Sequence, residues 1–310
     1  MSTTTGAVQP GAPPTGDGLR SSDLDADGLV VNAMSVDVED YFQVSGFEDI
    51  VPRQAWPTYE SRVSRNTDLV LQTFADAGIH ATFFVLGWVG ERFPDLVRRI
   101  AGAGHEVASH SHEHRLVYRL SRDEFREDLR RARGVLEDAI GCRVVGYRAP
   151  SYSITNESLW ALDVLIEEGY AYDASIYPVR HDRYGISTWP RHLTRVSRPA
   201  GAIWEFPGAT VRLGGTNLPI GGGGYFRLLP YQWTRYGFRR VNAERRPAMF
   251  YIHPWELDPS QPRLAGSTLS RFRHYRNLSV TAARLKSLVS EFRFGRVVDV
   301  VLAQERATVV

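Results

Sequence analysis

The sequence contains one cysteine, Cys142, and no apolar run long enough to cross a membrane. A single cysteine cannot form an internal disulfide, so the fold does not depend on an oxidising compartment. A membrane span needs about 20 mainly apolar residues, and a secretory signal needs a basic segment followed by an apolar one. Neither pattern is present. We therefore expect no integral membrane segment and, by default, a cytoplasmic location.

A strong excess of positive charge is also missing. The chain has 37 basic and 35 acidic residues among 310, which gives a formal net charge of +2. Proteins whose main partner is nucleic acid usually concentrate a large basic excess, so we expect no nucleic-acid partner. The hydrophobic fraction of 43% is ordinary for a globular protein and is sufficient for a large core.

The first 28 residues differ in composition from the rest of the chain. They are rich in Thr, Gly, Pro, Ser and Asp and carry few large apolar side chains. Such a segment buries too little apolar surface to offset the entropy lost on ordering. We expect residues 1–28 to be a disordered N-terminal tail, followed by a folded part from residue 29 to residue 310.

The folded part alternates between short apolar runs and amphipathic segments. The apolar runs predict strands at 29–37, 81–86, 106–109, 143–147, 249–253 and 296–302. The amphipathic segments predict helices at 64–77, 94–103, 157–168 and 280–292, and one more between the capping box of Ser121 and Glu124 and the stop at Gly141. This alternation predicts an α/β fold with a parallel sheet, in which functional sites lie at the carboxyl ends of the strands.

Two segments of the second half are expected to be loops. Four consecutive glycines at 221–224 predict a flexible loop whose backbone could approach a ligand closely. The basic run RFRHYR at 271–276 could attract an anionic polymer, but a solvated basic loop is the better expectation.

Polar side chains follow four of the predicted strands. These groups are Asp37, Glu39 and Asp40; His110, His112 and His114; Arg148; and His253. Because the carboxyl ends of parallel strands meet at one edge of the sheet, we expect these side chains to lie close together.

The pentapeptide HSHEH at 110–114 is a candidate metal site. His110 and His114 are four residues apart, so one helical turn would point both side chains in the same direction and His112 elsewhere. Two imidazoles and one carboxylate leave a coordination position free for water, which is the usual arrangement of a catalytic zinc site. Taken alone, the pentapeptide could equally be a solvated polar loop.

The acids of SVDVED at 35–40 are candidates for the carboxylate. If the strand continues, Asp37 and Glu39 share a face, and one could bind metal while the other acts as a base. On their own, these acids could instead cap the next segment or be solvated.

Five motifs in a fixed order carry a resemblance to a known family. SVDVEDYF (35–42), HSHEH (110–114), RAPSY (148–152), YDASIYP (172–178) and YIHPWE (251–256) resemble the motifs of the polysaccharide deacetylases, the NodB-like carbohydrate esterases of family 4. GGGYFRLLP (222–230) and RFRHYRN (271–277) are similar to the subgroup encoded beside bacterial exosortase and exopolysaccharide genes. The resemblance extends from about residue 29 to residue 301.

The resemblance implies a fold and a set of roles. The fold is a distorted (β/α) barrel with fewer strands than a full eight-stranded one, and about 255–302 forms a family-specific C-terminal extension. Asp37 matches the catalytic base, and Arg148 matches the arginine that orients it. His253 matches the general acid, and His110 and His114 match the metal ligands.

The third metal ligand departs from the commonest family motif. That motif has two adjacent aspartates, but Val38 follows Asp37 here. The ligand is therefore expected to be Glu39, as in related members with an acid-x-acid pattern, with Asp40 as the alternative. Tyr41, Tyr152 and Trp255 are expected to line the site and bind substrate.

The implied function is metal-dependent hydrolysis, most simply with Zn²⁺, of the N-acetyl group of N-acetylhexosamine units. The implied substrate is a bacterial exopolysaccharide or its precursor. The alternatives are a peptidoglycan or chitooligosaccharide deacetylase, a non-sugar amide hydrolase of the same barrel, and an inactive sugar-binding relative. The base and acid expected at Asp37 and His253 argue against the last of these.

Overall fold

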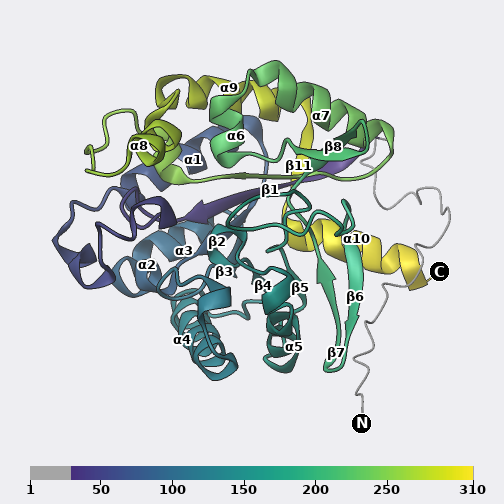
Figure 1. The fold of residues 1–310 in the computed structure, drawn as a ribbon, viewed down its shortest axis with the longest axis horizontal. Helices are drawn as coiled ribbons and strands as arrows, with labels where there is room; N and C mark the ends of the chain where they lie inside the picture. Colours follow the sequence, from purple (N-terminus) through teal and green to yellow (C-terminus); the bar gives the residue numbers. More distant parts are fainter. Residues whose placement is uncertain (1–28, 310) are drawn as a thin grey trace, which may run out of the picture.

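The computed structural model describes residues 29–309, which form an α/β fold around one mainly parallel sheet (Figure 1). The expected tail at 1–28 lies outside the described residues. Within 29–309 the main sheet has nine strands in the order β10-β1-β2-β3-β4-β5-β7-β6, with β11 also paired to β1. All neighbours are parallel except β6 and β7, and the sheet does not close on itself.

The strands of the main sheet are short apart from the first. They are β1 (Val31–Val38), β2 (Thr82–Val85), β3 (Glu106–Ser109), β4 (Gly146–Tyr147), β5 (Tyr172–Asp173), β6 (Thr194–Arg198), β7 (Gly201–Glu205), β10 (Met249–Ile252) and β11 (Arg293–Gly295). A separate antiparallel hairpin consists of β8 (Thr210–Leu213) and β9 (Thr216–Pro219).

Helices cover the sheet on both sides. They are α1 (Val63–Ala77), α2 (Gly87–Arg92), α3 (Pro94–Gly102), α4 (Arg122–Ile140), α5 (Trp160–Glu167), α6 (Gly223–Leu228), α7 (Tyr231–Ala243), α8 (Thr268–Tyr275), α9 (Leu278–Glu291) and α10 (Val297–Val309). In Figure 1, α4 and α5 lie below β2, β3 and β4, α2 and α3 lie beside β2 and β3, and α6, α7 and α9 lie above β1. The capping box predicted at Ser121 and Glu124 starts α4, and Gly141 ends it in a left-handed conformation.

Both faces of the strands are buried, and alternate residues of β1 belong to different clusters. Met34, Val36 and Val38 pack with the outer helices in the largest apolar cluster. Ala33 faces the other way, into a second cluster that contains Phe84 of β2. This period of two is what a strand imposes, and it points Ser35 and Asp37 toward the enclosed face of the sheet.

The predicted strand at 296–302 is wrong, because this segment begins helix α10. Its β-branched residues suggested a strand, but Val297, Val300 and Val301 have the three- and four-residue spacing of one helix face. These valines pack against Ala33 and Phe84 on the enclosed face of the sheet. The true final strand, β11, is the preceding segment Arg293–Gly295.

The four-glycine run is also not a flexible loop. Gly222 forms a β-bridge with Tyr251, and Gly223 begins α6. A Cβ at Gly222 would lie 1.9 Å from the Tyr251 carbonyl oxygen, and Gly222 has φ of 124°. Glycine is therefore required here because a strand, not a ligand, approaches the backbone. The basic run at 271–276 lies mainly in α8 and is likewise not a loop.

The remaining predicted elements are confirmed, with shifted ends. The strand expected at 143–147 is reduced to β4, and the strand at 29–37 becomes β1. None of the helices between residues 29 and 309 combines the length and apolar character needed to cross a bilayer. The cytoplasmic location and the division of the chain into a tail, a domain and an extension stay predictions.

A buried carboxyl at the amino end of β3 gives a test of the core. Burial raises the pKa of Glu106 from 4.5 to about 7, although Thr82, Tyr172 and the Val298 N–H donate hydrogen bonds to it. Because the pKa is raised in the folded state, the protonated Glu106 contributes to the free energy of unfolding. This contribution is complete below pH 4.5 and is lost as the pH rises through 7.

We expect Glu106→Gln to stabilise the protein by about 1–2 kcal/mol at pH 8 and by much less at pH 5, because the amide carries no charge. Urea unfolding of both proteins at the two pH values measures this difference. A variant that is less stable than the parent by the same amount at both values would contradict the assignment.

Candidate active site

Two carboxylates, those of Asp37 and Glu39, lie at the carboxyl end of the first strand. Asp37 lies next to Phe84 in the register of β1 and β2. The strand ends at Val38, and the Glu39 N–H donates to the Asp37 carbonyl at 3.1 Å. The condition under which Asp37 and Glu39 would share a strand face is therefore not met, but the two acids still line the same cavity. The chain turns there, so two neighbouring acids converge without a regular strand.

Asp40 has a different role. Its carboxylate accepts hydrogen bonds from Ser61 Oγ at 2.7 Å and from the backbone N–H groups of Arg62 and Val63 at 2.8 and 3.1 Å. It therefore satisfies free donors at the start of α1, as a capping residue does. Between Glu39 and Asp40, the geometry favours Glu39 as the third ligand.

The two histidines come from a loop and not from the helical turn predicted for 110–114. Ser111 and His114 have φ of 70° and 53°, which a helix does not allow. The loop is held by hydrogen bonds from the Gly87 N–H to the Ser111 carbonyl at 2.9 Å and from the His112 N–H to Asp128 at 3.0 Å. These contacts support the unusual backbone that places His110 and His114 side by side.

Glu39, His110 and His114 form a buried group with the composition of a metal site. One potential ligand atom from each lies within 4.8 Å of the other two. His114 Nε2 is 2.8 Å from Glu39 Oε2, which is buried and accepts no hydrogen bond. A buried carboxylate oxygen without a donor, facing two imidazoles, fits a divalent cation.

The charge states of this group favour metal binding. Burial lowers the pKa of His110 to about 4, so its imidazole is neutral near pH 7. Burial would raise the pKa of Glu39, but its close contact with His114 and the charge of His253 outweigh burial and lower that pKa to about 2. His110 Nδ1 lies 2.8 Å from the Arg148 carbonyl oxygen, so it donates its proton there and leaves Nε2 free as a ligand.

Arg148 holds Asp37 from the enclosed face of the sheet. Its side chain is fully buried, and Nη1 donates to Asp37 Oδ1 at 2.6 Å and to Ser35 Oγ at 2.9 Å. Nε donates to the Ala174 carbonyl at 3.1 Å, and the guanidinium carbon lies 4.1 Å from the centre of the Phe84 ring. The predicted pairing of Arg148 with Asp37 is present, and it leaves Oδ2 of Asp37 on the side of His253, whose Nε2 is 3.9 Å away.

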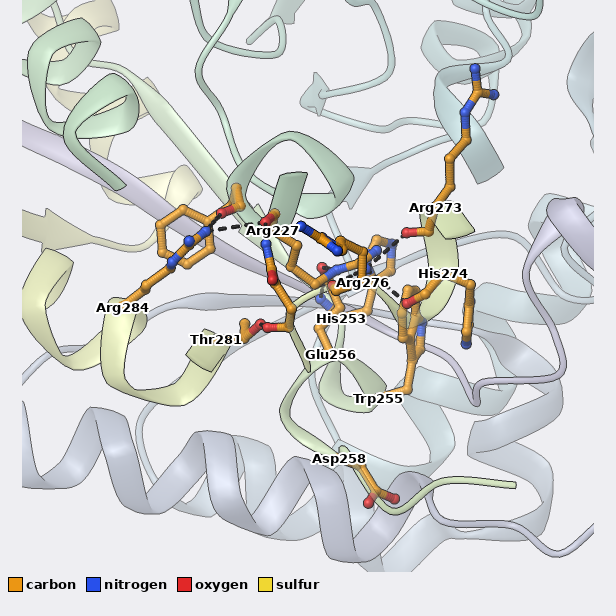
Figure 2. Close-up of polar contacts among 12 residues, drawn as sticks. Arg227, His253, Trp255, Glu256, Asp258, Arg273, His274, Arg276, Thr281 and Arg284 are labelled. Carbon is orange, nitrogen blue, oxygen red and sulfur yellow. Dashed lines mark hydrogen bonds and ion pairs between the residues drawn. The ribbon is translucent and has the colours of Figure 1, made fainter. Parts of the chain in front are cut away.

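His253 is held by two residues that the sequence analysis did not identify, Glu256 and Arg227 (Figure 2). His253 Nδ1 is 2.7 Å from Glu256 Oε1, and Arg227 Nε donates to Glu256 Oε2 at 2.5 Å. This arrangement turns His253 Nε2 toward Glu39 Oε1, 3.5 Å away. Burial alone would lower the pKa of His253, but the carboxylates of Glu256, Glu39 and Asp37 raise it to about 9.

Both residues had a signal in the sequence. Glu256 follows His253 by three residues in HPWE, the spacing of a capping box, and Arg227 lies in the GGGYFRLLP segment. Arg227 Nη1 also donates to the backbone carbonyls of Arg273, His274 and Arg276, so it ties α6 to α8. Only the tertiary structure pairs the two residues.

The three aromatic residues expected at the site differ in position. Tyr152 lines the cavity, and its buried hydroxyl makes no hydrogen bond within the described chain. Trp255 also lines it, and its indole N–H donates to Glu39 Oε1 at 3.3 Å while its ring stacks between His253 and His274. Tyr41 does not line the cavity, because its ring is buried edge-on against Phe42. The expectation that Tyr41 lines the site is therefore wrong.

Comparison with known families divides the chain into two matched parts. Residues 49–169 match the family described as polysaccharide deacetylase, and residues 174–302 match a domain of unknown function, DUF3473. The deacetylase match covers less than half of the chain, and it shows that residues 49–169 are similar to this family. The predicted resemblance is thereby confirmed.

Individual relatives match this deacetylase part. A peptidoglycan-N-acetylglucosamine deacetylase of Bacillus cereus is 31% identical over 98 residues, which are 31% of this chain and 36% of the relative. A chitooligosaccharide deacetylase of Sinorhizobium fredii is 34% identical over 112 residues, which are 36% of this chain and 49% of the relative. The chain thus spans less than half of the length of these two curated relatives.

A solved structure supports the fold over most of the chain. It is a polysaccharide deacetylase structure from Mycobacterium smegmatis, with a TM-score of 0.61 at 19% identity, and it covers 90% of this chain and 91% of that one. At this identity the likeness concerns the fold alone. The expected α/β fold of the deacetylase type, with its parallel strand core, is confirmed.

The contact between Trp255 and Glu39 can be tested by metal binding. Trp255→Phe keeps an aromatic ring between the two histidines but removes the N–H that orients Glu39. We expect the affinity for Zn²⁺ to fall about tenfold, because a ligand that has lost its outer hydrogen bond is less well oriented. Competition with a chelating dye measures the Kd.

Trp233→Phe is the matched control, because it removes an indole N–H that donates to the Pro219 carbonyl at 2.9 Å, outside the candidate site. Equal Kd values for the parent and both variants would contradict a role of Trp255 in orienting Glu39.

Proposed function

We propose that the protein is a metal-dependent N-deacetylase of N-acetylhexosamine units in a bacterial polysaccharide, an exopolysaccharide or its precursor, with release of acetate. The observation that carries this proposal is the group of Glu39, His110 and His114, flanked by Asp37 and His253 in one cavity of about 320 Å³. A carboxylate and a histidine on either side of a metal group are the base and the acid that amide hydrolysis needs.

We infer that Glu39, His110 and His114 hold the cation, most simply Zn²⁺. When bound, such a cation polarises the acetyl carbonyl and acidifies a water molecule. The chain's own residues then handle the protons. Asp37 accepts the proton of the attacking water through Oδ2, while its ion pair with Arg148 keeps the carboxylate in place. The water oxygen forms the new bond to the acetyl carbon.

His253 supplies the second proton. The carbon–nitrogen bond breaks only if the nitrogen is protonated, because an amine anion is a very poor leaving group. His253 Nε2 faces the cavity, and Nδ1 is held by Glu256. We infer that Nε2 protonates the departing sugar amine, and that Tyr152 contributes its unpaired hydroxyl to substrate binding.

The names of the relatives support a sugar substrate, and they leave peptidoglycan and chitooligosaccharides as competing polymers. Acetate release from polymers and oligomers of N-acetylhexosamines, with and without a chelator, separates these possibilities. Release from no glycan by a metal-loaded protein would instead favour a non-sugar amidase or an inactive sugar-binding protein.

The metal group is tested by removing its histidines. We expect His110→Ala and His114→Ala each to lose bound Zn²⁺ and to lower acetate release at least about 1,000-fold, as loss of an essential catalytic group does. Metal analysis and acetate assays measure both effects. If either variant keeps its metal content and its activity, the assignment of that histidine is wrong.

The hold of Glu256 on His253 is tested by Glu256→Gln, which keeps the shape of the side chain and removes its charge. We expect kcat to fall about 100-fold with little change in KM, because a poorly oriented acid affects proton transfer and not binding. Asp258→Asn is the control, because Asp258 pairs with Arg62 and Arg65 instead of His253. Similar effects of both substitutions on kcat would show that the loss is not specific to the acid.

A further inference from the structure

A second cavity continues from the candidate active site. It has a volume of about 500 Å³ and extends toward Tyr118 and Arg119. Arg183, Tyr184 and Arg273 belong to the walls of both cavities, so the two are joined at these residues. A sugar chain with one unit above the metal group would therefore place a neighbouring unit beside Arg183 and Arg273.

Arg183 and Arg273 differ from the other arginines in these walls. Arg119 pairs with Glu48, and Arg227 pairs with Glu256. Among residues 29–309, by contrast, the guanidinium groups of Arg183 and Arg273 form neither an ion pair nor a hydrogen bond. Two exposed positive groups without a counter-ion thus lie at the junction of the two cavities.

The two guanidinium groups act on the same place. Burial is the main cause that lowers the pKa of His181, and the charges of Arg273 and Arg183 lower it further, while the Asp182 carboxylate, 2.9 Å from His181 Nδ1, raises it. His181 stacks on Tyr184 with ring centres 3.9 Å apart, and the Tyr184 hydroxyl is hydrogen-bonded to that of Tyr225 at 2.8 Å. The junction therefore combines two cations with a supported tyrosine.

The backbone of Arg273 is held by Arg227, and its side chain lies apart from that contact. Its carbonyl oxygen accepts a hydrogen bond from Arg227 at 2.8 Å, and Figure 2 shows the Arg273 side chain extending away from the Arg227 group. Arg273 therefore reaches the cavity wall from helix α8, while Arg183 comes from the segment after β5.

We propose that Arg183 and Arg273 form a subsite for the carboxylate of an acidic sugar, a uronic acid next to the N-acetylhexosamine that is deacetylated. A guanidinium group matches a carboxylate in shape and charge, and each can donate two parallel hydrogen bonds to it. The second cavity is also lined by two acids, Asp49 and Glu48, and Glu48 pairs with Arg119, so the place where these walls favour an anion is the junction at Arg183 and Arg273. This inference rests on the proposed deacetylase function and specifies its substrate as an acidic polysaccharide.

The test compares two oligosaccharides of equal length. One alternates glucuronic acid with N-acetylglucosamine, and the other contains N-acetylglucosamine alone. Acetate release gives kcat/KM, and calorimetry gives Kd, for the parent protein and for Arg183→Gln, Arg273→Gln and the double variant. Arg271→Gln is the matched control, because Arg271 is an exposed arginine of the same helix outside both cavity walls.

We expect the parent to prefer the acidic oligosaccharide, and each substitution to weaken this preference about tenfold, mainly through KM and Kd, as loss of a hydrogen bond to a charged group does. Raising the salt concentration should weaken the parent's preference in the same direction. Arg271→Gln should keep the preference.

Three outcomes separate this proposal from the proposed function. Acetate release without any preference for the acidic oligosaccharide would overturn the subsite and leave the deacetylase standing. Equal losses in Arg271→Gln and Arg273→Gln would also overturn it. Preferential binding that depends on Arg183 and Arg273, without acetate release from either oligosaccharide, would support the subsite and overturn the deacetylase.

Discussion

The ion pair between Arg148 and Asp37 is the interaction around which the candidate site is organised. A fully buried guanidinium is costly unless its donors are satisfied, and this one is held by Asp37, Ser35 and the Ala174 carbonyl. The same residue offers its own carbonyl oxygen to His110. One arginine therefore orients the expected base and one expected metal ligand, and it connects strands β1, β4 and β5 at their carboxyl ends.

The polar site rests on an apolar floor. Phe84 lies directly under the Arg148 guanidinium, and below it the valines of α10 fill the space between the strands. This layer keeps water away from the ion pair, so that its charges interact strongly. The helix α10, which comes last in the chain, thus supports residues that come from the first strands.

The part of the chain matched by DUF3473 also contributes to the site. It supplies His253, its carboxylate partner Glu256 and the arginine that holds Glu256. Because Arg227 also binds the carbonyl groups at the end of α8, the orientation of His253 depends on how α6 and α8 pack. The expected acid and one wall of the cavity are therefore built by the same segment.

Local patterns in the sequence determined much of this protein. Periodicity predicted most strands and helices, and the order of the polar motifs predicted Asp37, His110, His114, Arg148 and His253. Four of these residues line one cavity, and the fifth, Arg148, is buried and pairs with Asp37. Spacing failed where tertiary contacts override it. The valine-rich sequence of α10 predicts a strand, but the segment forms a helix that packs against the sheet. The loop that contains His114 has a non-helical backbone because Gly87 and Asp128 hydrogen-bond to it.

The choice between Glu39 and Asp40, and the pairing of Glu256 with Arg227, rest on contacts between residues far apart in the chain. Asp40 is directed to the start of α1, while Glu39 meets the histidines and Trp255. The spacing of residues in the sequence does not predict these contacts, because each contact depends on how separate segments pack. The sequence by itself determined which residue types are available for the chemistry, and only the tertiary structure decided which of them face one another.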